Sequence, residues 1–280
     1  MMNNKLFSSE VIGKGITRIT GAGNELMYLI EGKSKAALLD TGIGVGNIRD
    51  YVENLTSLPI IVLLTHAHID HSAGAFWFHE VYLNERDAIL LDLEFNNTQC
   101  QLMYQDMKDF VAAANNSLAI DLQSTDFVKP YRKKFLSLND GDIFDLGNIT
   151  LEILACPGHT QGSVMVLIKE ERAILFGDSC NPSVWMFLPE SSTIGEYRES
   201  LLKIQERSSE YDKVYLSHNP NDASKDILDK VINICHSILE ENIVEVPYIG
   251  LGDNVFIAQS NTCSDVLEND IDIPVRILYK

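Results

Sequence analysis

An apolar run followed directly by a cluster of histidines is the feature that most constrains the fold. Residues 59–64 read Pro-Ile-Ile-Val-Leu-Leu, and residues 65–74 read Thr-His-Ala-His-Ile-Asp-His-Ser-Ala-Gly. A continuous apolar run of this length is typical of a strand buried on both faces of its sheet. Three of the chain's 7 histidines therefore stand just beyond a buried strand. A solvated loop would not need them there, and a packed core would not favour them.

The rest of the chain alternates short β-prone segments with amphipathic helical segments. Strands are predicted at 13–20, 25–32, 35–40, 59–64, 140–154 (as a hairpin), 163–169, 172–178 and 213–217. Helices are predicted at 46–56, within 85–120, at 194–206 and at 221–241, the last capped by Asn221 or Asp222. Two β-rich halves covered by helices favour a four-layer αββα sandwich, an α+β or α/β class, over a doubly wound sheet.

The domain organisation follows from the same pattern. We expect a single domain over residues 1–280, with its core at about 10–245 and a helical insertion around 85–130. The tail, residues 246–280, could add a strand or a dimer contact. At 45% hydrophobic residues, the chain can bury a full core, and it contains no linker or low-complexity run.

The composition and the apolar pattern indicate the cellular compartment and exclude some classes of binding partner. The net charge of −18 opposes binding to phosphate backbones, so we expect no nucleic-acid partner. The five cysteines form no Cys-x-x-Cys pair, which argues against a disulfide framework. The sequence shows no signal-peptide pattern and no apolar run of about 18 residues, so we expect a cytoplasmic protein without a membrane partner.

The spacing of the motif residues 66–71 indicates a metal site. Residues at i and i+2 of an extended segment point the same way, so His66 and His68 can share one ion. Asp70 and His71 follow where a turn can bring them to a second ion. Imidazole and carboxylate are ligands that suit zinc.

Further ligands must come from elsewhere in the chain. Three candidates each follow a predicted strand: His159 in Pro-Gly-His-Thr-Gln-Gly-Ser, Asp178 in Phe-Gly-Asp, and His218 in Leu-Ser-His. Loops at strand ends are held by a rigid scaffold, and such loops often carry the chemistry of α/β folds.

These motifs together resemble the metallo-β-lactamase superfamily. The resemblance covers roughly residues 15–220 and includes Leu-Leu-Asp-Thr-Gly around Asp40. It implies the αββα sandwich and a centre of two metal ions. It assigns His66, His68 and His159 to one ion, Asp70, His71 and His218 to the other, and Asp178 to both. Asp40 either orients a ligand histidine or holds the glycine-rich turn.

The expected function is that of a metal-dependent hydrolase, similar to the glyoxalase II and lactonase branch. Two zinc ions, or manganese or iron, would activate a bridging hydroxide, and Asp70 would hold that hydroxide and act in proton transfer. The presence of Asp178 argues against antibiotic hydrolysis, since the zinc β-lactamases generally lack the bridging aspartate. The expected substrate is a small-molecule ester, thioester or lactone, and Trp185 and Phe187 could line its acyl pocket.

Several alternatives stay open from the sequence. The same two metals could serve a phosphodiesterase, and a single iron could serve an oxidoreductase similar to the persulfide dioxygenases. Cys156 and Cys180 lie beside ligands in the sequence and could be ligands, reactive thiols or small buried residues. A homodimer is possible.

Overall fold

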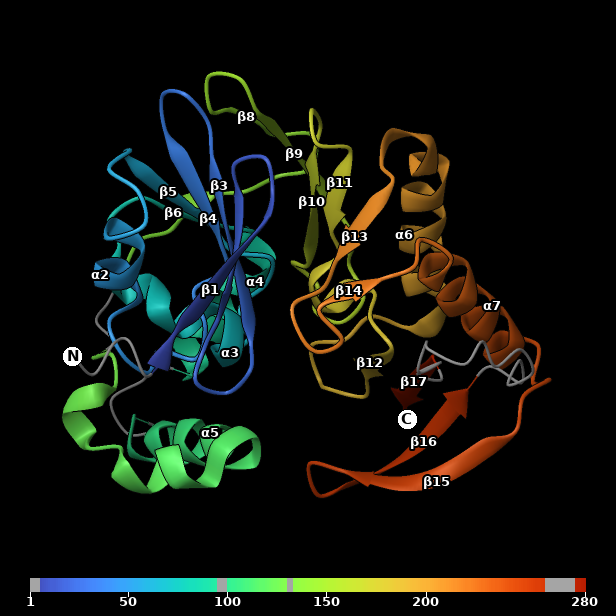
Figure 1. Cartoon of the computed structure of the whole chain (residues 1–280). Coiled ribbons are helices and arrows are strands. Elements are labelled where there is room, and N and C mark those ends of the chain that lie inside the picture. Colours follow the sequence, from blue (N-terminus) through green and yellow to red (C-terminus); the bar gives the residue numbers. More distant parts are fainter. Residues whose placement is uncertain (1–5, 95–99, 130–132, 260–274) are drawn as a thin grey trace, which may run out of the picture.

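Two β-sheets lie face to face, with helices on the outer side of each (Figure 1). The computed structural model describes residues 6–94, 100–129, 133–259 and 275–280. Leu63 from the first sheet and Val166 from the second meet in the core between the sheets. The predicted four-layer sandwich is confirmed.

The first sheet has the strand order β1-β2-β3-β4-β5-β6-β7. Its strands are β1 (Ser8–Gly13), β2 (Ile16–Thr20), β3 (Leu26–Glu31), β4 (Ala36–Leu39), β5 (Ile60–Leu63), β6 (Val81–Leu83) and β7 (Leu136–Ser137). Pairing is antiparallel from β1 to β4 and parallel from β4 to β7. The apolar run that precedes the motif is thus the interior strand β5, which pairs with β4 and β6, and the motif follows at its carboxyl end.

The second sheet has the order β14-β13-β11-β10-β9-β8. Its strands are β8 (Ile143–Asp145), β9 (Thr150–Ala155), β10 (Val164–Ile168), β11 (Ala173–Leu175), β13 (Lys213–Tyr215) and β14 (Asp222–Ala223). The predicted hairpin at 140–154 is β8–β9, and β10 pairs antiparallel with β11. The three remaining candidate ligands follow β9, β11 and β13, so all the candidate loops begin where a buried strand ends.

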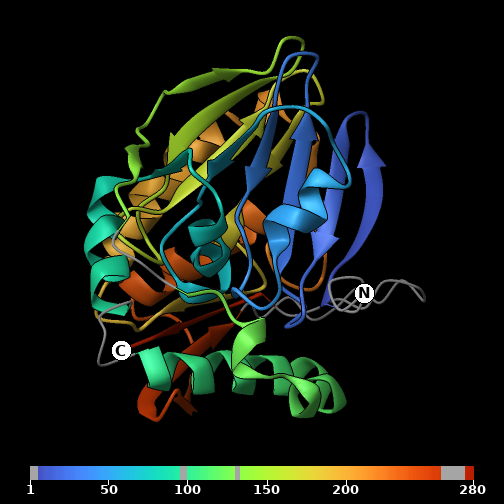
Figure 2. The same cartoon turned by 90° about the vertical axis from the view of Figure 1, so that its left-hand side faces the viewer.

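Helices cover the outer faces of both sheets (Figures 1 and 2). Those of the first half are α2 (Ile48–Glu53) after β4, α3 (Ile69–Ser72) and η1 (Ala73–Trp77) after β5, and α4 (Glu85–Glu94), α5 (Cys100–Asp121) and η2 (Ser124–Asp126) after β6. Those of the second half are η3 (Gly177–Ser179), α6 (Ile194–Glu206), η4 (Ser208–Glu210) and α7 (Ile227–Leu239). The predicted insertion at 85–130 contains α4, α5 and η2. Among the described residues, no helix is both long enough and apolar enough to span a membrane.

The start of the last helix differs from the sequence prediction. α7 begins at Ile227 with Asp226 as its N-cap, and not at Asn221 or Asp222. Residues Asp222–Ala223 instead form β14, which pairs antiparallel with β13. The chain therefore turns back on β13 and adds a short antiparallel strand before the helix starts, and the capping pattern at Asn221 and Asp222 does not indicate this strand.

A third, four-stranded sheet has the order β12-β17-β16-β15. It combines β12 (Ser183–Met186) with three strands from the tail: β15 (Glu245–Gly250), β16 (Asp253–Gln259) and β17 (Arg276–Tyr279). The β15–β16 hairpin and α5 both lie at the lower end of the molecule in Figures 1 and 2, and α3 lies in the lower half of Figure 1. The tail and the insertion therefore flank the end of the sandwich that carries the histidine motif.

Candidate metal centre

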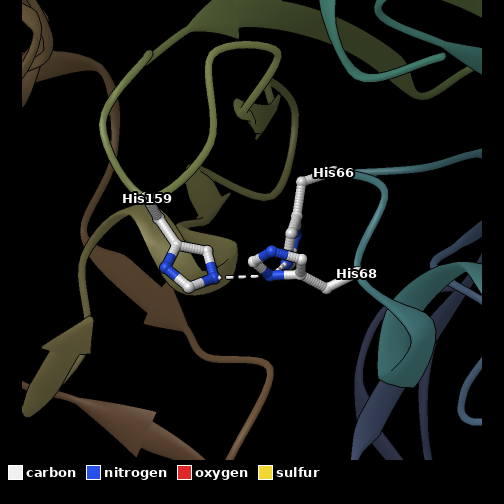
Figure 3. A group of neighbouring side chains, drawn as sticks. All are labelled: His66, His68 and His159. Carbon is white, nitrogen blue, oxygen red and sulfur yellow. Dashed lines mark hydrogen bonds between the residues drawn. The ribbon is translucent and has the colours of Figure 1, made fainter. Parts of the chain in front are cut away.

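Three histidines from two loops form the first cluster (Figure 3). His66 and His68 follow β5, and His159 follows β9. Nδ1 of His68 lies 3.1 Å from Nε2 of His66 and 2.8 Å from Nε2 of His159. In a four-coordinate zinc site, neighbouring ligand nitrogens lie about 3.3 Å apart. The two distances are close to this value, and all three ligand atoms lie within 4.8 Å of one another, so the three histidines can ligate one ion.

A second cluster lies next to the first and contains both aspartates. Its members are Asp70, His71, Asp178 and His218. Nε2 of His218 lies 3.3 Å from one oxygen of Asp70, 3.3 Å from Oδ2 of Asp178 and 3.3 Å from Nε2 of His71. The structure thus brings together all seven predicted ligands, from four strand-end loops, in two adjacent groups.

Asp178 is the residue that connects the two clusters. Its Oδ2 lies 3.3 Å from Nε2 of His218 in the second cluster and 3.7 Å from Nε2 of His159 in the first. Its Oδ1 is buried and has no hydrogen-bond partner among the described residues. A buried carboxylate oxygen without a partner is costly, and coordination of a cation removes that cost. The donor set therefore fits two metal ions that share Asp178.

Comparison with known families agrees with this geometry. The family model of the metallo-β-lactamase superfamily matches residues 20–218. The chain belongs to this superfamily. The family predicted from the motifs is confirmed, and the matched region contains both clusters.

Relatives of this superfamily member include two thioester hydrolases by name. Over 189 residues it is 25% identical to the acyl-coenzyme A thioesterase MBLAC2 of Bos taurus, covering 61% of this chain and 66% of that protein. Over 193 residues it is 26% identical to a hydroxyacylglutathione hydrolase of Francisella tularensis, covering 69% and 62%. The matches thus span just under two thirds of these relatives' lengths.

A solved structure shows the same fold. A metallo-β-lactamase from Pontibacter korlensis aligns with a TM-score of 0.60 at 16% identity, covering 82% of this chain and 99% of that one. At this identity, the likeness supports the fold alone.

The histidines of the two clusters differ in their pKa values. Burial lowers the pKa of His66 well below its usual range and, together with the neighbouring His68, lowers the pKa of His159 to about 4. Burial also acts on His218, but the carboxylates of Asp178 and Asp70 outweigh it and raise its pKa to about 10. His66 and His159 therefore offer neutral nitrogens, and His218 in the second cluster holds a positive charge, which a cation would replace.

Asp40 lies beneath the second cluster. Its Oδ2 accepts hydrogen bonds from Nδ1 of His71 at 2.9 Å and from Oγ1 of Thr65 at 2.8 Å, and its Oδ1 accepts one from the Thr65 amide. Such a carboxylate fixes the tautomer of His71 and points its Nε2 into the cluster. Of the two roles considered from sequence, this contact favours orientation of a ligand histidine.

Asp87 on α4 is a buried residue that sequence reasoning missed. Its carboxylate accepts hydrogen bonds from the Ala67 amide at 3.0 Å, from Oγ1 of Thr160 at 2.7 Å and from the Gly162 amide at 2.6 Å. It therefore ties the His66–His68 loop to the His159 loop. A Cβ atom at position 162 would lie 2.5 Å from Asp87 Oδ1, so only glycine allows this approach. In the sequence, Asp87 is one acidic residue in a helical segment, which gives no signal of this role.

Glu190 is a second missed residue, in the loop between β12 and α6. Its Oε1 lies 2.7 Å from Nε2 of His68, whose Nδ1 faces the first cluster. The neighbouring Ser191 donates from Oγ to the carbonyl of His159 at 3.0 Å. One loop thus contacts two of the three histidines. The carboxylate of Glu190 also adds a negative charge next to a cluster whose three ligands are all imidazoles.

The two residues predicted to line an acyl pocket lie side by side, with ring centroids 5.4 Å apart, but they differ in exposure. The Trp185 side chain is 37% exposed, and its carbonyl accepts a hydrogen bond from Nδ1 of His159 at 2.8 Å. Phe187 is 3% exposed and packs with Val255 and Leu278 in a small core. Only Trp185 therefore offers its side chain at the surface beside the metal centre.

The two cysteines beside the ligands are buried in the core between the second sheet and its helices. Burial raises the pKa of Cys156 to about 12, and neither cluster includes Cys156 or Cys180. Of the sequence alternatives, the small buried residue is the one that this environment favours.

Glu25 is a third missed residue, in the turn before β3. It is 2% exposed, and it accepts hydrogen bonds from the amides of Gly23 at 2.8 Å and Ile43 at 3.1 Å. The Ile43 loop also supports the motif helix, because Thr41 bonds the carbonyl of His71 through its amide and Oγ1. Burial raises the pKa of Glu25 to about 7.

We expect Glu25→Gln to flatten the pH dependence of stability. Because the folded state keeps the proton up to about pH 7, while the unfolded state loses it near 4.5, wild-type stability falls as pH rises between these values. The loss is about 3 kcal/mol, at about 1.4 kcal/mol per pKa unit. Urea unfolding at several pH values measures it. The exposed Glu85→Gln should keep the wild-type slope, and an unchanged slope in Glu25→Gln would contradict the assignment.

Proposed function

We propose that this superfamily member hydrolyses acyl thioesters of small thiols with two bound divalent cations, zinc being the expected metal. The observation that carries the proposal is the pair of adjacent clusters joined by Asp178. The named activities of its relatives support the thioester: one is an acyl-coenzyme A thioesterase, and the other is a hydroxyacylglutathione hydrolase. Both names describe hydrolysis of a thioester bond.

The cations, when bound, would polarise the thioester carbonyl and lower the pKa of a water molecule to about 7. The chain's own residues then have distinct tasks. Asp40 keeps Nε2 of His71 directed into the second cluster, and Glu190 does the same for Nδ1 of His68 in the first. These contacts hold the donors in place before substrate arrives, which keeps the cost of reorganisation low.

Asp70 has a task at the reacting water. Burial would raise the pKa of its carboxyl, but the neighbouring His71 and His218 hold it well below its usual range, so it is a carboxylate. A carboxylate in this place accepts a hydrogen bond from water and fixes its orientation for attack on the carbonyl. In the overall reaction, the proton that water loses ends on the departing thiol.

The complete second cluster supports two ions over the single iron of a persulfide dioxygenase. A mononuclear iron site of that kind needs only two histidines and one aspartate. The two clusters together offer seven donors, five histidines and two aspartates, which is more than one ion requires. A phosphodiesterase would use the same seven residues, so substrate assays must separate these two hydrolases.

The test has two measurements on the purified chain. We expect elemental analysis to find two metal ions per chain, and a substrate panel to show cleavage of acyl thioesters in preference to lactone, phosphodiester and β-lactam probes. Chelation should abolish the activity, and added zinc should restore it. One iron per chain with oxygen consumption would contradict the proposal, and cleavage of phosphodiesters alone would replace it with the phosphodiesterase.

A further inference from the structure

The third sheet presents a row of apolar side chains on one of its faces. Trp185 on β12 stands opposite Leu278 on β17, Leu278 stands opposite Ile257 on β16, and Ile257 stands opposite Val246 on β15. Paired residues of neighbouring strands point to the same face. The four side chains therefore cross the whole sheet in one line. Tyr248 lies beside the end of this line, two residues beyond Val246.

The two faces of this sheet have different surroundings. Ala258, Ile277 and Tyr279 alternate with the row residues and lie in the core that includes α7. Among the residues that the structure describes, the face that carries the row is covered in its middle, where Phe187 packs on Val255 and Leu278. At its two ends the apolar side chains are open: Trp185 is 37% exposed, Val246 45% and Tyr248 51%.

The row begins next to His159, whose Nε2 belongs to the first cluster and whose Nδ1 faces the backbone of Trp185. The Trp185 carbonyl accepts the hydrogen bond from Nδ1 of His159, a member of the first cluster. From β12 to β15 the row crosses three inter-strand spacings, about 14 Å in total. A substrate whose reacting carbonyl lies at the clusters could therefore lay an aliphatic chain along this face.

We propose that the row face of the third sheet, formed by Trp185, Ile257, Val246 and Tyr248 around the Phe187 core, binds the acyl chain of the substrate and selects medium to long chains. The inference rests on the proposed thioester hydrolysis. We assign the acyl chain to this face because the row side chains are apolar and uncharged, and because the row starts next to the site where the acyl carbonyl would react. Three of the four strands come from the tail, so the tail sets the acyl specificity of a reaction performed by residues 66–218.

The experiment compares acetyl, octanoyl and dodecanoyl thioesters of N-acetylcysteamine on wild type and on the double variant Val246→Ser, Tyr248→Ser. A fully buried methylene group strengthens binding about fourfold, and one that lies on an open face about twofold. We expect wild-type kcat/KM to rise with chain length. The double variant should lose about tenfold on the dodecanoyl thioester and stay unchanged on the acetyl one.

Ile249→Ser is the matched control, because Ile249 lies on the same strand, points to the opposite face and is 67% exposed. It should keep the wild-type profile. The same chain-length dependence in wild type and the double variant would overturn the proposal. A second outcome would also overturn it: light scattering shows that wild type is a dimer and the double variant a monomer, while the chain-length dependence is unchanged. A second copy of the chain would then cover this face.

A binding measurement separates this proposal from the proposed function. The dodecyl thioether of N-acetylcysteamine cannot be hydrolysed, and we expect calorimetry to show that it binds wild type at least tenfold more tightly than the double variant. Such binding without any thioester turnover would support the acyl-binding face while the proposed function fails. Equal affinity in both proteins, or no binding, would overturn the acyl-binding face whatever the turnover.

Discussion

Asp70→Ala is expected to lose at least about 10³-fold in turnover on an acyl thioester, the range expected for removal of a group that acts in both proton transfer and metal binding. The reason is position: one carboxylate oxygen lies 3.3 Å from Nε2 of His218 and 3.5 Å from Nε2 of His71. Alanine removes a donor of the second cluster and the acceptor that orients water. The helix itself should survive, because alanine is a good helix former.

Three measurements make the Asp70 prediction sharp. Elemental analysis should find that the second ion is bound more weakly while the first is retained, since the three histidines of the first cluster are untouched. Circular dichroism should match wild type. The exposed Asp50→Ala on α2 is the control for loss of one negative charge, and it should keep wild-type turnover. Hydrolysis by Asp70→Ala at more than a tenth of the wild-type rate would show that Asp70 has neither role.

The ligand positions could be predicted from sequence because each ligand follows a strand that the local sequence pattern already indicates. The apolar run before His66 predicts a buried strand, and the motif stands where that strand ends. His159, Asp178 and His218 follow strands in the same way. Parallel or adjacent strands of two packed sheets bring such ends to one edge. The order of motifs along the chain, which resembles the superfamily, then predicts which ends meet.

The supporting residues could not be predicted, because their contacts join distant parts of the chain. Asp87 meets Gly162, Glu190 meets His68, and Glu25 meets Ile43, each through one carboxylate. Nothing in the local sequence distinguishes these acidic residues from the many that form the chain's charge of −18. The late start of α7 has a different cause, because the short strand β14 pairs with the preceding strand β13 and occupies the residues that the capping pattern assigned to the helix.

Asp87→Ala should destabilise the fold and weaken metal binding together. The substitution leaves the buried amides of Ala67 and Gly162 without an acceptor, and the expected cost is about 3 kcal/mol in the free energy of unfolding, at about 1–3 kcal/mol per unsatisfied group. Both amides belong to loops that carry first-cluster histidines. When these loops are no longer tied together, we expect metal affinity to fall by about 10–100-fold, the usual effect of losing a residue that positions ligands.

Asp87→Ala should lower both stability and metal affinity, whereas substitution of an ordinary buried residue should lower stability alone. A competition assay with a chromophoric chelator measures metal affinity on folded protein, well below the unfolding transition, so loss of stability alone does not change it. Asp140→Ala is the matched control, because Asp140 is exposed and accepts a single backbone hydrogen bond, from Ala155 at 2.8 Å. It should cost less than about 1 kcal/mol and leave metal affinity unchanged. If Asp87→Ala is destabilised but binds both ions with wild-type affinity, the carboxylate stabilises the fold without positioning the histidines, and other contacts of the first cluster, such as those of Glu190 with His68 and of the Trp185 carbonyl with His159, hold its donors in place.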